Sequence, residues 1–193
     1  MDYYNNLQQG APSGQKGGGD AAEKELRIFL IGFMGCGKTY WGRQLAQKLE
    51  LPFFDLDHQI EEKEERSINE IFAAEGEEYF GRLEKEVLHL ITESHGAFVM
   101  ATGGGTPCFY NNIEYMKKAG IAVWINCSAT SLHQRLLQEK EHRPLLKDLT
   151  DDQLLAYITK KGADRNIFYR QATTTVNGEG LSLEKLVDKI FHI

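Results

Sequence analysis

The chain has 193 residues, 41% of them hydrophobic, and its 22 basic and 28 acidic side chains give a formal net charge of -6. This length fits one domain with a substantial core, and the acidic balance argues against general affinity for nucleic acid or for an anionic membrane. The three cysteines are widely spaced and show neither a disulfide framework nor a Cys-x-x-Cys metal pattern, which favours a reduced, cytoplasmic setting.

The chain begins with a segment that offers little to pack. Residues 1–25 are rich in Gly, Gln, Asn and Ala and show no apolar periodicity, so we expect a disordered tail, either native or left over from cloning. The segment lacks the basic start and apolar core of a secretory signal, and no apolar run in the chain approaches the roughly 18 residues needed to cross a bilayer. One folded domain is therefore expected over residues 26–193.

The first predicted strand, residues 27–31, leads into a glycine-rich loop. Residues 32–39 read Gly-Phe-Met-Gly-Cys-Gly-Lys-Thr, and a predicted helix follows over residues 40–49. Glycines let backbone N–H groups approach phosphate oxygens, and the start of the helix favours negative charge. Lys38 adds a cation, and the Thr39 hydroxyl can ligate a Mg²⁺ ion that bridges two phosphates. This strand, loop and helix predict a nucleotide-phosphate site.

Two carboxylates end the second predicted strand, residues 51–57. Because side chains alternate along a strand, we expect Asp55 and Asp57 to share one face. A third predicted strand, residues 97–101, runs directly into the three glycines at 103–105. Ligands of a parallel sheet lie beyond the carboxyl ends of its strands, so these features and the glycine-rich loop should gather at one edge.

Helices and strands alternate along the rest of the chain, which predicts an α/β fold with a five-stranded parallel sheet and helices on both faces. A charged stretch without periodicity, residues 139–150, is predicted to form a mobile lid. One more helix is predicted to start at the capping box of residues 67–70, to break at Glu75-Gly76 and to resume over residues 77–93. Further helices are predicted to begin at Pro107, at Ser128 or Thr130, at a second capping box at 150–153, and at Ser182. The remaining predicted strands are residues 122–127 and 173–177.

Together these features resemble the shikimate kinase family over residues 26–193. The order and spacing of several motifs carry the resemblance, although each motif alone would be weak. They are the loop at 32–39, Asp-Leu-Asp at 55–57, Ser-Ile-Asn-Glu-Ile-Phe at 67–72 with Glu-Gly-Glu at 75–77, Ala-Thr-Gly-Gly-Gly at 101–105, Arg-Pro-Leu-Leu at 143–146, and Arg165 followed by Tyr169. The resemblance implies a phosphate-loop kinase, a three-layer sandwich with a closing lid. It also implies ATP- and Mg²⁺-dependent phosphorylation of the 3-hydroxyl of shikimate in aromatic amino acid biosynthesis.

The resemblance further implies a role for each matching residue. Lys38, Asp57 and Arg143 would be catalytic, with Asp57 as the general base and Arg143 neutralising charge from the lid. The expected ATP-binding residues are Gly35, Cys36, Gly37, Lys38, Thr39, Tyr40, Arg135, which would lie against adenine, and Arg143; the expected shikimate-binding residues are Asp57, Gly103, Gly104, Gly105 and Arg165; and Thr39 and Asp55 would hold Mg²⁺. We expect a monomer whose partner is the small-molecule substrate.

Each of these roles has a purely structural alternative. Asp57 could cap a helix, the three glycines could form a plain turn, Arg165 could make a surface ion pair, and Arg135 could simply be solvated. Two rival functions also remain at this stage. One is a kinase for another small polyol acid such as gluconate, and the other is a nucleotide-binding regulatory protein that has lost turnover.

The chain departs from the family pattern in one place. Shikimate kinases usually carry Phe-Arg-x-x-Glu in the helix after the Glu-Gly-Glu turn, and that Arg helps to bind the substrate carboxylate, whereas residues 80–84 read Phe-Gly-Arg-Leu-Glu. Arg82 is turned by about 100° around the helix from Gly81. Either Arg82 reaches across, or Arg165 binds the carboxylate alone, or the protein binds shikimate weakly or prefers another substrate. We expect an active enzyme with a raised KM that Gly81→Arg lowers.

Overall fold

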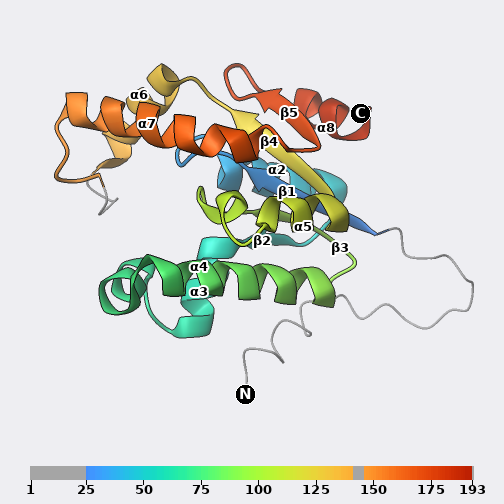
Figure 1. The fold of residues 1–193 in the computed structure, drawn as a ribbon. Coiled ribbons are helices and arrows are strands. Elements are labelled where there is room, and N and C mark those ends of the chain that lie inside the picture. The colour runs from blue at the N-terminus through green and yellow to red at the C-terminus, as the bar shows by residue number, and fades with distance from the viewer. Residues whose placement is uncertain (1–24, 141–145, 193) are drawn as a thin grey trace, which may run out of the picture.

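The computed structural model describes residues 25–140 and 146–192 (Figure 1). The predicted tail lies outside the described residues except for Glu25, and so do residues 141–145 of the predicted lid, Arg143 among them. The elements in chain order are β1 (Leu26–Ile31), α2 (Lys38–Leu49), β2 (Phe53–Asp55), α3 (Leu56–Glu64), α4 (Ile68–Ser94), β3 (Ala97–Ala101), the 3-10 helix η1 (Thr106–Cys108), α5 (Asn112–Ala119), β4 (Ile121–Asn126), α6 (Ala129–Glu139), α7 (Asp151–Tyr169), β5 (Thr174–Asn177) and α8 (Leu183–Phe191).

The strands form one five-stranded sheet in the order β2-β3-β1-β4-β5, and every pair in it is parallel. The central strand β1 pairs with β3 on one side and β4 on the other, so Leu30 lies beside both Ala101 and Val123. Parallel strands require crossovers, and helices supply them along the whole chain. The predicted five-stranded parallel sheet is therefore confirmed.

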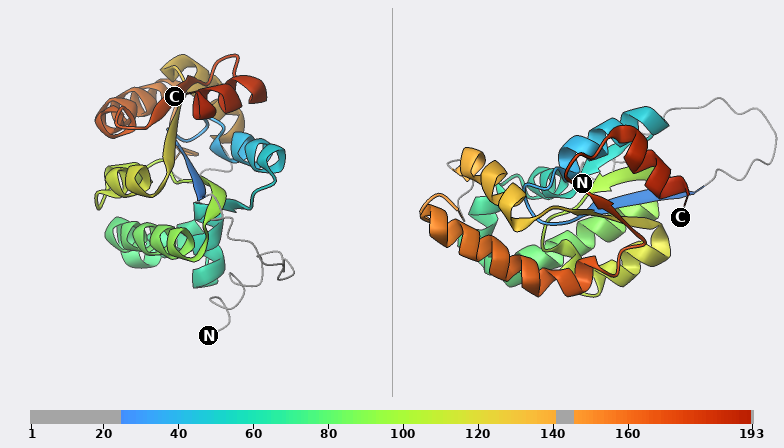
Figure 2. Two further views of the ribbon diagram at one scale, coloured as in Figure 1. Left: turned by 90° about the vertical axis from the view of Figure 1, so that its right-hand side faces the viewer. Right: turned by 90° about the horizontal axis from the view of Figure 1, so that it is seen from above.

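Helices cover both faces of this sheet (Figure 2). Ile28 and Leu30 of β1 point into a core formed with α2, α6, α7 and α8, whereas Phe29 and Ile31 point into a second core formed with α3, α4 and α5. Because both faces of β1 are buried, its sequence is a continuous apolar run instead of an alternating one. The sheet and its two helical layers form the three-layer sandwich that was expected. Tyr169 of α7 also packs into the second core.

Most helix boundaries follow the signals in the sequence. Ser67 and Thr150 each form the predicted capping box, with Glu70 and Gln153 as their partners. Helix α4 is kinked at Gly76, where φ is 81° and ψ is -179°, in agreement with the predicted break. Of the two cap candidates for α6, the structure uses the first, since Ser128 accepts a hydrogen bond from the backbone of Ser131.

The predicted strand over residues 51–57 is wrong at its end. Strand β2 stops at Asp55, which is the N-cap residue of α3, and Asp57 lies in the first turn of that helix. The period-two argument that placed Asp55 and Asp57 on one strand face therefore fails. The helical turn nevertheless brings both carboxylates to the carboxyl edge of the sheet, where they line one cavity.

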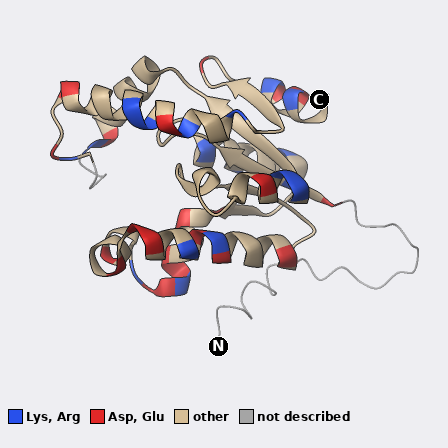
Figure 3. Cartoon of the chain, viewed as in Figure 1, with Lys and Arg blue, Asp and Glu red and all other residues tan. Residues whose placement is uncertain are grey.

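The charged residues of α3 and α4 are mainly acidic, with a few basic residues among them (Figure 3). Within residues 25–140 and 146–192, no helix is both long and apolar enough to cross a membrane. The cysteines at positions 36, 108 and 127 are all free.

Candidate active site

The glycine-rich loop between β1 and α2 has the backbone geometry of a phosphate cradle. Gly35 and Gly37 have φ values of 78° and 98°, in the left-handed region that disfavours a side chain. The Lys38 ammonium is buried and donates to the carbonyl oxygens of Gly32 at 2.9 Å and Phe33 at 3.0 Å. The lysine thus lies across the loop at the start of α2, where a phosphate group would meet both its charge and the free helix N–H groups.

Arg135 of α6 supports this loop from outside. Its guanidinium Nη1 donates to the carbonyl oxygens of Gly35 at 3.2 Å and Cys36 at 3.4 Å, and Nη2 donates to Gly178 at 3.5 Å. The side chain is therefore not simply solvated, and it lies beside the loop that would hold the nucleotide. Its expected position against adenine stays a prediction.

Thr39 and Asp55 form the pair expected at a magnesium site. The Thr39 hydroxyl donates to Oδ2 of Asp55 at 2.7 Å, so two hard oxygen donors meet at the rim of a cavity of about 200 Å³. Magnesium prefers one or two protein oxygens together with phosphate and water, and this pair fits that preference. The cavity is lined by Met34, Gly35, Gly37, Lys38, Thr39, Asp55, Asp57, Thr102, Gly104 and Glu139.

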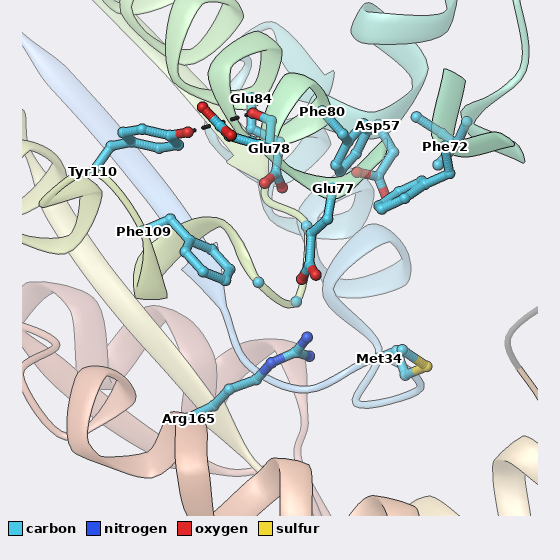
Figure 4. A pocket seen from close by; sticks show the side chains of 15 residues that line it. Met34, Asp57, Phe72, Glu77, Glu78, Phe80, Glu84, Phe109, Tyr110 and Arg165 are labelled. Carbon is cyan, nitrogen blue, oxygen red and sulfur yellow. Dashed lines mark hydrogen bonds between the residues drawn. The ribbon is translucent and has the colours of Figure 1, made fainter. Parts of the chain in front are cut away.

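A second cavity, of about 510 Å³, lies between α4, α7 and the loop after β3 (Figure 4). Of the three glycines of that loop, Gly103 has no room for a side chain and Gly104 has little. A Cβ on Gly103 would lie 2.5 Å from Oε1 of Glu84 and 3.1 Å from Oδ1 of Asp57. The glycines therefore let polar groups of the cavity wall approach the backbone closely, which a plain turn would not need.

Arg165 of α7 points into this larger cavity (Figure 4). Its Nη1 is buried and has no hydrogen-bond partner among the described residues, and its guanidinium lies 5.5 Å from the centre of the Phe33 ring. A buried guanidinium donor without a partner carries a desolvation cost that an anionic ligand would remove. Arg165 is thus placed to meet a carboxylate bound in this cavity, and no ion pair of Arg165 is found among the described residues.

Asp57 lines both cavities, as do Met34 and Gly104. Its carboxylate therefore lies between the phosphate cradle and the pocket that contains Arg165. Tyr169 fixes the same region, because its hydroxyl donates to the carbonyl of Gly104 at 2.5 Å. Burial is the main cause that raises the pKa of this phenol, so it stays a donor.

The sequence interpretation assigned no role to Glu84, which is buried in the wall of the larger cavity. Burial raises the pKa of this carboxyl to about 8, with the Thr106 hydrogen bond opposing the shift and nearby Asp57 adding to it. The hydroxyl of Thr106 donates to Oε1 of Glu84. A signal was available, since Glu84 falls on the apolar stripe of α4 that also carries Phe80 and Val87.

Arg82 does not take the place of a side chain at position 81. It is exposed, pairs with Glu78 at 2.6 Å and lines a separate surface groove with Lys85. Gly81 itself is buried and lines the larger cavity, where the ring of Tyr110 packs against it. Three explanations were open for the glycine at position 81. In this conformation the geometry excludes the one in which Arg82 reaches into the cavity in place of an arginine at position 81.

Two expected ATP-binding residues are less informative. Tyr40 is 61% exposed near the start of α2, and its ring meets that of Trp41 edge-on. Arg143 lies outside the described residues. The described end of the predicted lid is the turn after them, where the buried Leu146 accepts a backbone hydrogen bond from Leu149 at 3.1 Å.

Comparisons with known proteins give one consistent result. A family model described as shikimate kinase matches residues 34–193. The chain is 44% identical over 147 residues to a shikimate kinase of Bacteroides fragilis, a match that covers 76% of this chain and 82% of the relative. It is 38% identical over 164 residues to a shikimate kinase of Azobacteroides pseudotrichonymphae, with 85% and 96% covered.

Solved structures agree with these sequence matches. The crystal structure of shikimate kinase from Bacteroides thetaiotaomicron superposes with a TM-score of 0.81 at 38% identity and covers 87% of this chain and 99% of the other. Shikimate kinase from Acinetobacter baumannii in complex with shikimate gives a TM-score of 0.76 at 36% identity, with 88% and 95% covered.

Proposed function

The chain belongs to the shikimate kinase family, and on that premise we propose that it transfers the terminal phosphoryl group of ATP to the 3-hydroxyl of shikimate, giving shikimate 3-phosphate and ADP. The observation that carries this proposal is the position of Asp57. Its carboxylate lines both the phosphate cradle and the pocket that contains Arg165. A hydroxyl bound beside it would face the phosphate to be transferred.

The phosphate side of the site needs positioning and charge more than covalent chemistry. Lys38 and the loop N–H groups bind the phosphates of ATP, and the lysine exchanges its two carbonyl partners for phosphate oxygens. Thr39 would hold Mg²⁺, and Asp55, which accepts the Thr39 hydrogen bond, would act on it through bound water. The ion, when bound, neutralises part of the charge on the phosphate groups.

On the acceptor side, Arg165 binds the carboxylate of shikimate, for which its planar guanidinium is suited. The triple glycine lets the backbone contact the sugar-like ring of the substrate, since a side chain on Gly103 would collide with Glu84 and one on Gly104 would crowd Arg165. Asp57 accepts a hydrogen bond from the reacting hydroxyl and takes its proton as the bond to phosphorus forms. This assignment uses one cation and one base, each supplied by a different helix.

Three further residues complete the proposal at the nucleotide. Arg135, beside the loop, contributes to the adenine site, and Tyr40 contacts the nucleotide from the first turn of α2. Arg143, from the segment 139–150 proposed as a lid, neutralises charge on the transferred group. We also propose a cytoplasmic monomer, and the three free cysteines suit the reducing conditions of that compartment.

A coupled assay of ADP release, with and without shikimate, tests the function. We expect ADP release that requires both shikimate and Mg²⁺, no release with gluconate, and no signal from Lys38→Met. Release of ADP with gluconate but not with shikimate would favour the polyol-acid rival, and ATP binding without release would favour the regulatory one. The relatives named above all bear the name shikimate kinase, so they favour neither rival.

A further inference from the structure

Gly81 and Tyr110 occupy one space in the wall of the acceptor pocket. Gly81 lies within α4 and is buried, and a Cβ placed on it would lie 3.0 Å from Cε2 of Tyr110 and 3.8 Å from its hydroxyl oxygen. A contact of 3.0 Å is tighter than a Cβ atom normally makes, so even the first carbon of a side chain at position 81 would push against the Tyr110 ring and require it to shift by a few tenths of an ångström. Both residues line the cavity that contains Arg165, and Figure 4 shows Tyr110 in its wall.

The Tyr110 ring is held in this position from two sides. Its hydroxyl donates to the carbonyl of Glu78 at 3.3 Å, and the ammonium of Lys85 lies 6.0 Å from the ring centre. Tyr110 and Asn111 both have left-handed backbone angles, with φ of 49° and 59°. Two such residues in succession are unusual without glycine, and backbone strain of this kind collects where a side chain must be presented in one direction.

The loop that presents the ring is anchored below it. Asn112 is fully buried, its Nδ2 donates to the carbonyl of Thr106 at 3.0 Å, and its backbone N–H donates to Phe109 at 2.9 Å. Thr106 in turn donates to Glu84. The ring of Tyr110 is therefore tied to the same wall that carries the buried carboxyl group.

The charges around the cavity restrict how a carboxylate substrate can lie against the wall formed by Gly81 and Tyr110. Among the described residues that line it, Arg165 is the only cation, whereas Asp57, Glu77 and Glu78 are acidic. Glu84 lines it too, but burial raises the pKa of this carboxyl to about 8, so it is mostly protonated at neutral pH. A carboxylate substrate can meet Arg165 and avoid the acids only if its ring is held in one orientation. Tyr110 presents an aromatic surface next to Gly81, on the α4 side of the pocket, where it can limit that orientation.

We propose that Tyr110 is a specificity-determining residue of the acceptor pocket, whose ring fills the space of a side chain at position 81 and holds the substrate with its carboxylate toward Arg165. The inference rests on the proposed function, because it concerns the same pocket. It also changes the expectation for Gly81→Arg. With Tyr110 in place, an arginine there collides with the ring, so the single substitution should raise KM instead of lowering it.

Four variants test the coupling: Tyr110→Phe, Tyr110→Ala, Gly81→Arg and the double variant Gly81→Arg/Tyr110→Ala. We expect Tyr110→Ala to raise the KM for shikimate by about tenfold, with kcat and the KM for ATP within about twofold of wild type. Tyr110→Phe keeps the ring and should stay within about threefold. Gly81→Arg should raise KM, and the double variant should have a lower KM than Gly81→Arg alone, because the two side chains then no longer compete.

The outcomes separate this inference from the proposed function. If the wild-type protein shows no shikimate-dependent ADP release, the proposed function is wrong and the inference falls with it. If the wild type is active but Tyr110→Ala keeps its KM for shikimate within twofold, Tyr110 does not determine specificity. The inference is equally overturned if Gly81→Arg lowers KM in the presence of Tyr110. Thermal unfolding of each variant shows whether it still folds. If Tyr110→Ala does not fold, Tyr110→Phe decides: a KM for shikimate within threefold of wild type supports a role for the aromatic ring, and a higher KM contradicts it.

Discussion

The hydroxyl of Thr39 donates a 2.7 Å hydrogen bond to Oδ2 of Asp55, which joins the first turn of α2 to the end of β2. These residues are 16 positions apart, and the bond places one neutral and one charged oxygen at the edge of the phosphate cavity. A cation that bridges the phosphates would meet Thr39 first, and the carboxylate would orient its water. The pair therefore predicts how activity depends on Mg²⁺.

Asp55→Asn should increase the Mg²⁺ concentration that gives half-maximal activity by about 10- to 100-fold, because it removes the charge that orients metal-bound water. The KM for shikimate should change little, since Asp55 does not line the acceptor pocket. Magnesium titrations of initial rate measure both quantities. Thr39→Ser, which retains the hydroxyl, is the matched control. An unchanged magnesium requirement in Asp55→Asn would remove Asp55 from the metal site.

Arg165 should account for most of the binding of the substrate carboxylate. Arg165→Ala removes a charge-assisted hydrogen bond worth about 1.5–3 kcal/mol, so the KM for shikimate should rise by about 10- to 150-fold. Arg82→Ala is the control, because this exposed arginine on α4 pairs with Glu78 and does not line the pocket. Steady-state kinetics at saturating ATP distinguish the two variants. An equal effect of both would mean that Arg82 moves into the site when substrate binds.

Asp57 should matter for the chemical step more than for binding. Asp57→Asn retains the size of the side chain but cannot take a proton, so kcat should fall by about 10²- to 10⁴-fold. The neighbouring His58 is exposed and pairs with Glu62, which makes His58→Asn a control on the same helix. Single-turnover measurements of shikimate phosphorylation give the rate directly. Normal turnover by Asp57→Asn would contradict its assignment as the base.

The sequence was sufficient for features that depend on local chemistry. The phosphate loop, the kink at Gly76 and the caps at Ser67 and Thr150 each follow from a few adjacent residues, and each is present. Asp57 was misplaced for a local reason too. The sequence fits a strand over residues 51–57 as well as it fits a strand that ends at Asp55 and is followed by a helix. The helical pattern is weak because only Leu56 and Ile60 of α3 are buried.

Features of the acceptor pocket depend on contacts between distant residues, and the sequence could not supply them. Tyr110 and Asn111 have left-handed backbone angles, but neither is a glycine, so the sequence does not predict this conformation. The contact between Tyr110 and Gly81 joins a loop residue to a helix residue 29 positions earlier in the chain. Without that contact, glycine at position 81 reads as a missing arginine, whereas in the structure it makes room for an aromatic ring.

The buried carboxyl group of Glu84 makes the stability of the fold depend on pH. Burial raises its pKa from the ordinary 4.5 to about 8, and Asp57 and Glu77 add to the shift, whereas the Thr106 hydrogen bond and Arg165 oppose it. In the unfolded chain the carboxyl titrates near its ordinary pKa. Between these two pH values the folded protein holds a proton that the unfolded chain has lost. The stabilising effect of this proton is thus complete below the ordinary pKa and decreases as pH rises toward 8.

The free energy of unfolding should therefore fall as pH rises from about 5 to about 8, by at most about 1.4 kcal/mol per pH unit for this one group. Glu84→Gln cannot ionise and still offers Thr106 an acceptor, so the decrease should be smaller in this variant and its stability at pH 9 should exceed that of wild type. Urea unfolding at pH 5, 7 and 9 measures the difference. Glu78→Gln, on the exposed side of the same helix, should keep the wild-type pH dependence. If Glu84→Gln and wild type lose stability in parallel, the buried carboxyl is already ionised at neutral pH, and the cavity wall must supply a counter-charge to it.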